Sequence, residues 1–129
     1  MEQPRYLVDT NALIDYLGNK LPASGLNFMN GVIDVVPNIS VISKIEVLGF
    51  NTSVEHYKTL SDFINDATVF DLSGSVVEMS IEIRRKYKTK LPDAIIAATA
   101  LVHALVLISR NISDFKNIDG LKVIDPHSL

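Results

Sequence analysis

The sequence contains no cysteine and no tryptophan, and it has no long uninterrupted apolar run. The absence of cysteine excludes a disulfide framework, a thiolate zinc site and cysteine catalysis. The most apolar stretch, residues 94–109, is interrupted by His103 and falls short of the roughly 20 residues that a membrane-spanning helix needs. Asp9 and Asp15 lie within the first apolar segment, which is not typical of a secretory signal. We therefore expect a soluble cytoplasmic protein.

A strong excess of one charge sign is also absent. The chain has 12 Lys and Arg against 15 Asp and Glu, which gives a formal net charge of −3. Hydrophobic residues make up 47% and charged residues 21%, a composition that excludes a disordered chain. The length of 129 residues is that of one domain, large enough to bury a core without disulfides or a structural metal. We expect residues 1–129 to form a single domain.

Short apolar segments alternate with longer segments of helical periodicity, and this alternation predicts the fold class. The apolar segments predict strands at residues 6–8, 35–36, 68–72, 105–108 and 121–124. Helices are predicted over residues 11–17, from Ser40 onward and over residues 93–103. Two more helices are predicted to begin at capping boxes, one at Thr52 and one at Ser75. The helix that begins at Thr52 is expected to bury Tyr57, Leu60 and Ile64. The strands are apolar throughout, as expected where helices cover both faces of a sheet. The pattern predicts a three-layer α/β/α sandwich with a central parallel sheet of about five strands.

Four acidic side chains are expected near the carboxyl edge of this sheet, where open parallel sheets bind ligands. Asp9 follows the first strand, and Glu46 lies in the helix after the second. Asp93 lies in the first turn of the helix before the fourth strand, and Asp114 follows that strand. Unpaired acids repel one another in a partly dry cleft, and no Lys or Arg directly follows the first two strands. Their oxygens suit Mg²⁺ or Mn²⁺, ions that assist phosphodiester hydrolysis.

Each of the four acids also has a purely structural interpretation. Asp9 is a good helix cap, and the spacing Ser43-x-x-Glu46 matches a capping box. Asp93 complements a helix dipole, and Asp114 is an ordinary loop acid. Structural roles for all four would require four coincidences at one sheet edge, whereas a shared ligand site accounts for them together.

Four segments, in order across essentially the whole chain, resemble the PIN-domain ribonucleases and most closely the VapC-type toxins of bacterial and archaeal toxin–antitoxin modules. The segments are Leu7–Ile14, Ser40–Glu46, Leu91–Ala100 and Ser109–Phe115. The resemblance implies that the catalytic site, which holds one or two Mg²⁺ or Mn²⁺ ions, consists of Asp9, Glu46, Asp93 and Asp114. It implies supporting hydrogen bonds from Asn11, Ser109 and Asn111. Ser109 stands where family members commonly have Thr, and it keeps the hydroxyl group.

The same resemblance implies an activity and partners. The expected activity is endonucleolytic hydrolysis of RNA, leaving 5′-phosphate and 3′-hydroxyl ends. The expected partners are an RNA substrate, a cognate antitoxin protein that occupies the cleft, and a second copy of the chain in a homodimer. No membrane partner is expected.

A basic run around Tyr87 has two interpretations. It is either a solvated helix end that complements the dipole or a track for RNA phosphates, and it comprises Arg84, Arg85, Lys86, Lys88 and Lys90. Without the four site carboxylates the formal net charge of −3 becomes about +1, so the remaining surface is slightly basic. Tyr16 and Phe115 are either base-stacking or core residues. The three histidines fall in no metal-ligand pattern and are given no role.

A receiver domain of signalling proteins is the alternative of similar size and sheet. Asp71, at the end of the third predicted strand, would then accept a phosphoryl group, and Ser109 would supply a hydroxyl. Asp9 has no acidic neighbour, and no Lys directly follows the fifth strand. The receiver interpretation also leaves three of the four acids without a role. A metal-free RNA-binding or scaffold protein is a third possibility, which the intact acidic positions disfavour.

Overall fold

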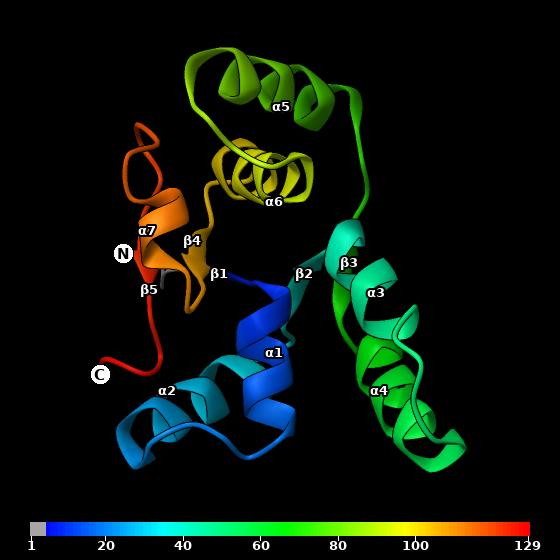
Figure 1. Ribbon diagram of the computed structural model, residues 1–129. Helices are drawn as coiled ribbons and strands as arrows, with labels where there is room; N and C mark the ends of the chain where they lie inside the picture. Colours follow the sequence, from blue (N-terminus) through cyan, green and yellow to red (C-terminus); the bar gives the residue numbers. More distant parts are fainter. Residues whose placement is uncertain (1–4) are drawn as a thin grey trace.

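A computed structural model describes residues 5–129 and contains a central sheet of five parallel strands in the order β3-β2-β1-β4-β5 (Figure 1). The strands are β1 (Tyr6–Val8), β2 (Asn38–Ser40), β3 (Thr68–Phe70), β4 (Val106–Ile108) and β5 (Val123–Ile124). From β1 the chain forms β2 and β3 on one side, then crosses to form β4 and β5 on the other. The order therefore switches between β1 and β4, and ligands bind at such a switch point.

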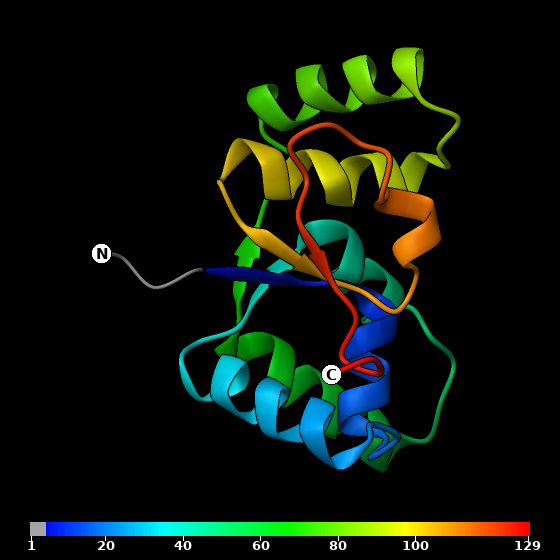
Figure 2. The same cartoon turned by 90° about the vertical axis from the view of Figure 1, so that its left-hand side faces the viewer.

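Helices cover both faces of this sheet, as the alternation of segments predicts. Figure 2 shows α6 against one face with α5 stacked outside it, and α1, α2 and α4 on the opposite face. The three-layer α/β/α prediction is confirmed. Within residues 5–129 the helices are α1 (Thr10–Leu17), α2 (Ala23–Asp34), α3 (Val41–Leu48), α4 (Val54–Asp66), α5 (Gly74–Lys86), α6 (Leu91–Val102) and α7 (Ile112–Phe115).

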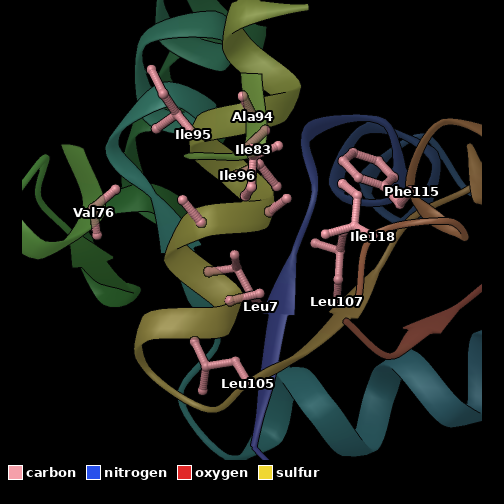
Figure 3. Close-up of a cluster of buried hydrophobic side chains, with 13 residues drawn as sticks. Leu7, Val76, Ile83, Ala94, Ile95, Ile96, Leu105, Leu107, Phe115 and Ile118 are labelled. Carbon is pink, nitrogen blue, oxygen red and sulfur yellow. The ribbon is translucent and has the colours of Figure 1, made fainter. Parts of the chain in front are cut away.

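The sheet separates two apolar cores because successive strand residues point to opposite faces. Leu7 and Leu107 belong to the core beneath α6, shown in Figure 3, whereas Val8 and Ile108 belong to the core beneath α1 and α2. Helix α6 is buried on nearly all sides from Ala94 to Ala100, since it lies between α5 and the sheet. Because the alanine side chains of α6 are small, α5 and the sheet both pack closely against it. This packing fixes the position of the first turn of α6.

The prediction of a strand at Val35 and Val36 is wrong. These side chains are 74% and 58% exposed and lie between α2 and β2. The actual strand β2 begins at Asn38, whose side-chain amide donates to the carbonyl of Tyr6 at 2.9 Å. Hydrogen bonds to a neighbouring strand, rather than local apolar content, therefore determine this strand. The preceding helix α2 was not predicted, because its two glycines weaken the helical pattern.

Two predicted helix starts are shifted. Ser53 rather than Thr52 caps α4, accepting from the backbone N–H of His56, and Ser73 rather than Ser75 caps α5. Leu60 and Ile64 are buried as predicted, whereas Tyr57 is exposed. Among residues 5–129 no helix combines the length and the apolar character needed to cross a bilayer.

Two glycines of α2 provide a matched test of how the C-terminal segment is seated. A Cβ on Gly25 would lie 1.8 Å from the carbonyl oxygen of Pro126, whereas a Cβ on Gly31 would meet no atom within 4 Å. Gly31→Ala should raise the free energy of unfolding by about 0.5–1 kcal/mol through helix propensity. Gly25→Ala should lower it by about 1–3 kcal/mol through overpacking. Urea denaturation measures both, and equal stabilisation by the two changes would contradict the seating of Pro126 on α2.

Candidate active site

Asp9 lies at the switch point between β1 and β4 and is only 4% exposed. Its Oδ1 accepts from the backbone N–H of Thr10 at 2.8 Å and so caps α1. Its Oδ2 accepts from the hydroxyl of Ser109 at 2.9 Å. The capping interpretation of Asp9 is therefore correct, but it accounts for one carboxylate oxygen and leaves the other directed at the end of β4.

Ser109, directly after β4, connects the ends of the two central strands. Its buried Oγ donates to Asp9 and accepts from the backbone N–H of Asn111 at 3.0 Å. The side-chain amide of Asn11 lies within hydrogen-bond distance of Ser109 Oγ and Asp9 Oδ2, and its Oδ1 accepts from the backbone N–H of Arg110 at 3.0 Å. Asn11 and Ser109 thus fix the Asp9 carboxylate. Asn111 forms hydrogen bonds through its backbone N–H and carbonyl groups, and the residue is exposed.

Glu46 reaches the same edge from α3. Helix α3 begins at Val41 and is capped by Ser40, so the proposed capping box of Ser43 and Glu46 is wrong. Instead, Glu46 Oε1 accepts from the hydroxyl of Thr10 at 2.7 Å. Sequence reasoning did not assign a role to Thr10, although its position between Asp9 and Asn11 in the first motif was an available signal.

Neighbouring acids influence the ionisation of Asp9 and Asp93. Burial is the main cause that raises the pKa of Asp9; hydrogen bonds from Ser109 and Thr10 oppose this effect, and the charges of Asp93 and Glu46 add to it. Burial also raises the pKa of Asp93, and the charges of Asp114 and Glu46 add to that effect while Lys90 opposes it. The carboxylates carried by α3, α6 and α7 therefore share one electrostatic environment with Asp9.

Asp15 shows how differently the fold treats a second buried aspartate. It is 3% exposed, and its Oδ2 lies 3.1 Å from Arg110 Nη1 and 2.8 Å from His127 Nε2. His127, to which the sequence assigned no role, therefore holds the C-terminal segment against α1. Among the ion pairs within residues 5–129, none involves any of the four site acids. Asp9 is thus buried without a cationic partner, whereas Asp15 is neutralised.

The donor chemistry of this edge fits a hard divalent cation bound partly through water. The available ligands are carboxylate oxygens with hydroxyl and amide oxygens beside them, which is the set that Mg²⁺ and Mn²⁺ prefer. Within the described part of the chain, no three His, Asp or Glu side chains lie close enough together to enclose an ion directly. Mg²⁺ does not require such a cage, because it is commonly held by one or two carboxylates, several waters and a substrate phosphate.

The fold divides the basic run. Lys88 and Lys90 line a cavity of about 280 Å³ whose wall includes Asp93 and Asp114. The other members lie elsewhere: Lys86 pairs with Asp119 at 3.2 Å, and an apolar groove beside α5 is lined by Arg84 and Arg85. Phe115 is fully buried, so the base-stacking interpretation of Phe115 is wrong.

The strand order excludes the receiver-domain alternative. Receiver domains have the order 2-1-3-4-5, which places the third strand in the centre of the sheet. Here β3 is an edge strand, and the exposed Asp71 that follows it lies apart from the centre of the switch point.

An open parallel α/β sheet with an acidic centre at its switch point defines the class of this protein. The chain belongs to the PIN domain family, whose profile matches residues 6–121. Ribonuclease VapC2 of Methanocaldococcus jannaschii is 28% identical over 143 residues, an alignment that covers 97% of this chain and 96% of the relative.

Solved structures agree with this family. A structure described as a toxin–antitoxin complex from Klebsiella pneumoniae is 33% identical, with a TM-score of 0.74 and coverage of 94% of this chain and 97% of that chain. DNA-bound VapBC from Salmonella typhimurium has a TM-score of 0.82 at 22% identity, covering 96% of this chain and 99% of that chain. At that identity, the likeness to the Salmonella protein shows the fold.

The contrast between the two buried aspartates predicts opposite effects of the same substitution. A raised pKa means that the folded state binds the Asp9 proton more tightly than the unfolded state does. Stability is therefore lost as the pH rises from the unfolded value near 3.9 through the folded pKa. In chelator-treated buffer, Asp9→Asn should raise the melting temperature at pH 7 by a few degrees, and this gain should shrink as the pH approaches 4.

Asp15→Asn is the matched control, because it removes one partner of a neutralised pair. It should lower the free energy of unfolding at pH 7 by about 1–3 kcal/mol. Thermal denaturation followed by circular dichroism measures both variants. Destabilisation by Asp9→Asn at neutral pH would show that the hydrogen bonds from Ser109 and Thr10 outweigh the burial of its charge.

Proposed function

We propose that the protein is an endoribonuclease dependent on Mg²⁺ or Mn²⁺ and acts as the toxin of a VapBC-type toxin–antitoxin module. The observation that carries the proposal is the buried Asp9 carboxylate, which forms no ion pair within residues 5–129 and is influenced by the charges of Asp93 and Glu46 at the switch point. A site of this kind is stabilised by a cation that binds the folded state. Membership of the PIN family and the likeness to a protein named ribonuclease VapC2 support the substrate class.

In this mechanism Asp9, Glu46, Asp93 and Asp114 hold the ion, directly or through water. A bound divalent ion polarises a phosphate and lowers the pKa of a water molecule, which favours in-line hydrolysis of a phosphodiester. Ser109 and Asn11 keep the Asp9 carboxylate in one orientation, and Thr10 does the same for Glu46. The exposed Asn111 side chain would supply a further hydrogen bond to the substrate phosphate. This preorganisation avoids reorganising the ligands when the substrate binds.

An antitoxin is the proposed protein partner. The Klebsiella relative, which is 33% identical over nearly the whole chain, is described as part of a toxin–antitoxin complex. Exposed apolar side chains lie on several helices of this chain, among them Ile45 on α3 and Val54 on α4. Such side chains are suited to cover by a partner protein.

A homodimer is also proposed, with α5 as its contact surface. Val77 and Ile81 are exposed on the outside of α5, beside a groove of about 440 Å³ that Leu91 also lines. Antiparallel pairing of α5 with its copy about Ile81 would set Glu78 opposite Arg84 in both directions. This symmetric charge pattern is what a two-fold interface requires.

Charge introduced at the centre of this surface tests the dimer. Ile81→Glu should convert a dimer into a monomer, because it places two like charges against each other at the two-fold axis. Val54→Glu, at an apolar and more exposed position on α4, should leave the mass unchanged. Light scattering coupled to size exclusion gives the mass, and a dimer that survives Ile81→Glu contradicts this interface.

Removal of one site carboxylate tests the nuclease. Asp93→Asn should lower Mg²⁺-dependent cleavage of RNA by about 100-fold or more, since preorganised electrostatic stabilisation contributes that much in typical active sites. The control is Asp71→Asn, which removes the same charge from an aspartate outside the site. This variant should cleave RNA at the rate of the unsubstituted protein. Cleavage is measured on a labelled single-stranded RNA with the melting temperature as a control for folding.

Metal binding provides a second measurement. Mg²⁺ should raise the melting temperature of the unsubstituted chain by mass action, and this increase should be smaller for Asp93→Asn than for Asp71→Asn. Unchanged cleavage by Asp93→Asn would show that Asp93 is structural and that the proposed site is wrong.

A further inference from the structure

The cavity beside the acidic site is formed by two segments that are distant in sequence. The loop between α5 and α6 provides one wall, and the segment that includes α7 and continues to Ile118 provides the other. Its volume is about 280 Å³, just below the range of about 300–1,000 Å³ that holds a whole small molecule. Because Asp93 and Asp114 form part of its lining, the cavity is continuous with the acidic site.

The lining of this cavity combines three kinds of group. Tyr87 and Ile118 provide apolar surface, and Asn117 provides an amide that both donates and accepts hydrogen bonds. Lys88 and Lys90 bring positive charge to the side that borders the acids. Most of the lining residues are therefore polar or charged, and the ring of Tyr87 provides an aromatic surface among them.

Tyr87 is held in a fixed position. Its hydroxyl accepts from the backbone N–H of Asp119 at 3.0 Å, and the Nζ of Lys86 lies 5.6 Å from its ring centroid. Lys86 in turn pairs with Asp119 at 3.2 Å. Lys86 is therefore engaged in positioning the aromatic ring, whereas Lys88 and Lys90 form no ion pair within the described residues.

We propose that this cavity binds the nucleotide of single-stranded RNA that neighbours the cleaved phosphate. Its base packs against the ring of Tyr87 and forms hydrogen bonds with Asn117, while Lys88 and Lys90 bind its phosphate. Aromatic side chains commonly stack unpaired RNA bases, and lysines bind the backbone. The volume suits one base rather than a whole small molecule, so the site reads a single position of the substrate. This inference rests on the proposed nuclease function and identifies where that function selects its substrate.

Two double variants of equal charge change test the phosphate contacts. Lys88 and Lys90 changed together to alanine remove both lysines of the cavity, whereas Arg5 and Lys58 changed together to alanine remove two exposed cations that do not line it and serve as the control variant. The probe is a short 2′-O-methyl phosphorothioate RNA, whose integrity is checked after each titration. Fluorescence anisotropy in Mg²⁺ buffer measures its affinity.

The lysine variant should bind about 10-fold more weakly at low salt. Its slope of log affinity against log salt should be shallower by about 0.7, since the one phosphate that the two lysines neutralise contributes about 0.7 on a single strand. The control variant should change affinity less than about 2-fold, because it removes no contact to the proposed phosphate. Equal losses in the two variants would show general charge attraction and overturn the site.

Probes that lack one base test the stacking. A base missing at the position next to the cleaved phosphate should weaken binding by the unsubstituted chain by about 5- to 150-fold, the range for one stacked base. Tyr87→Leu should abolish this difference, and Tyr87→Phe, which keeps the ring, should retain it. A difference that persists in Tyr87→Leu would overturn the proposed position of the base.

These measurements separate the inference from the function on which it rests. Probe binding that depends on the lysines and on Tyr87, in a protein that cleaves no RNA, would contradict the nuclease and support the nucleotide site. Cleavage and probe binding that are both unaffected in the lysine variant would overturn the site and leave the nuclease standing. Weaker antitoxin binding by that variant, with unchanged probe binding, would assign the cavity to the protein partner and overturn the inference.

Discussion

The burial of the Asp9 charge is the constraint on which the site depends. The fold encloses this carboxylate among a helix N-terminus, the Ser109 hydroxyl and the Asn11 amide, and within residues 5–129 it supplies no cation that pairs with it. Six residues later the same chain buries Asp15 and does supply one, through Arg110. The charge of buried Asp15 is thus compensated by a cation, whereas the charge of buried Asp9 is not. An uncompensated buried charge marks a candidate functional site, and Asp9 is where we propose that a cation binds.

The position of Asp93 depends on the packing of α6. This helix is confined between α5 and the sheet along its alanine-rich length, so its first turn has little freedom to move away from Asp9. The repulsion among the acids therefore cannot be relieved by rotating the helix. Close packing of small residues on one side of the molecule maintains an unfavourable electrostatic arrangement on another.

The sequence predicts the parallel sheet and the acidic residues at its carboxyl edge better than it predicts strand β2 or the positions of the basic residues. Asp9 and Ser109 were identified because each directly follows a strand whose apolar signal is strong. The strand at Asn38 was missed because its partners, rather than its own residues, hold it in place. The division of the basic run was also beyond sequence reasoning, since the sequence does not show that Lys88, after the end of α5, lines the cavity beside the acids while Arg85, on α5, lines another groove. The periodicity of apolar residues does not show which groove each of these basic side chains lines.

The hydrogen bond between Asp9 and Ser109 joins residues that are 100 positions apart in the chain. Parallel strands with such distant partners pair late in folding, because closing the long loop between them is entropically unfavourable. On the ribosome, Asp9 therefore emerges long before the strand that completes its surroundings. A truncated or half-synthesised copy therefore has the first acid without its supporting hydroxyl, and this part of the site is incomplete until the chain beyond β4 has been made.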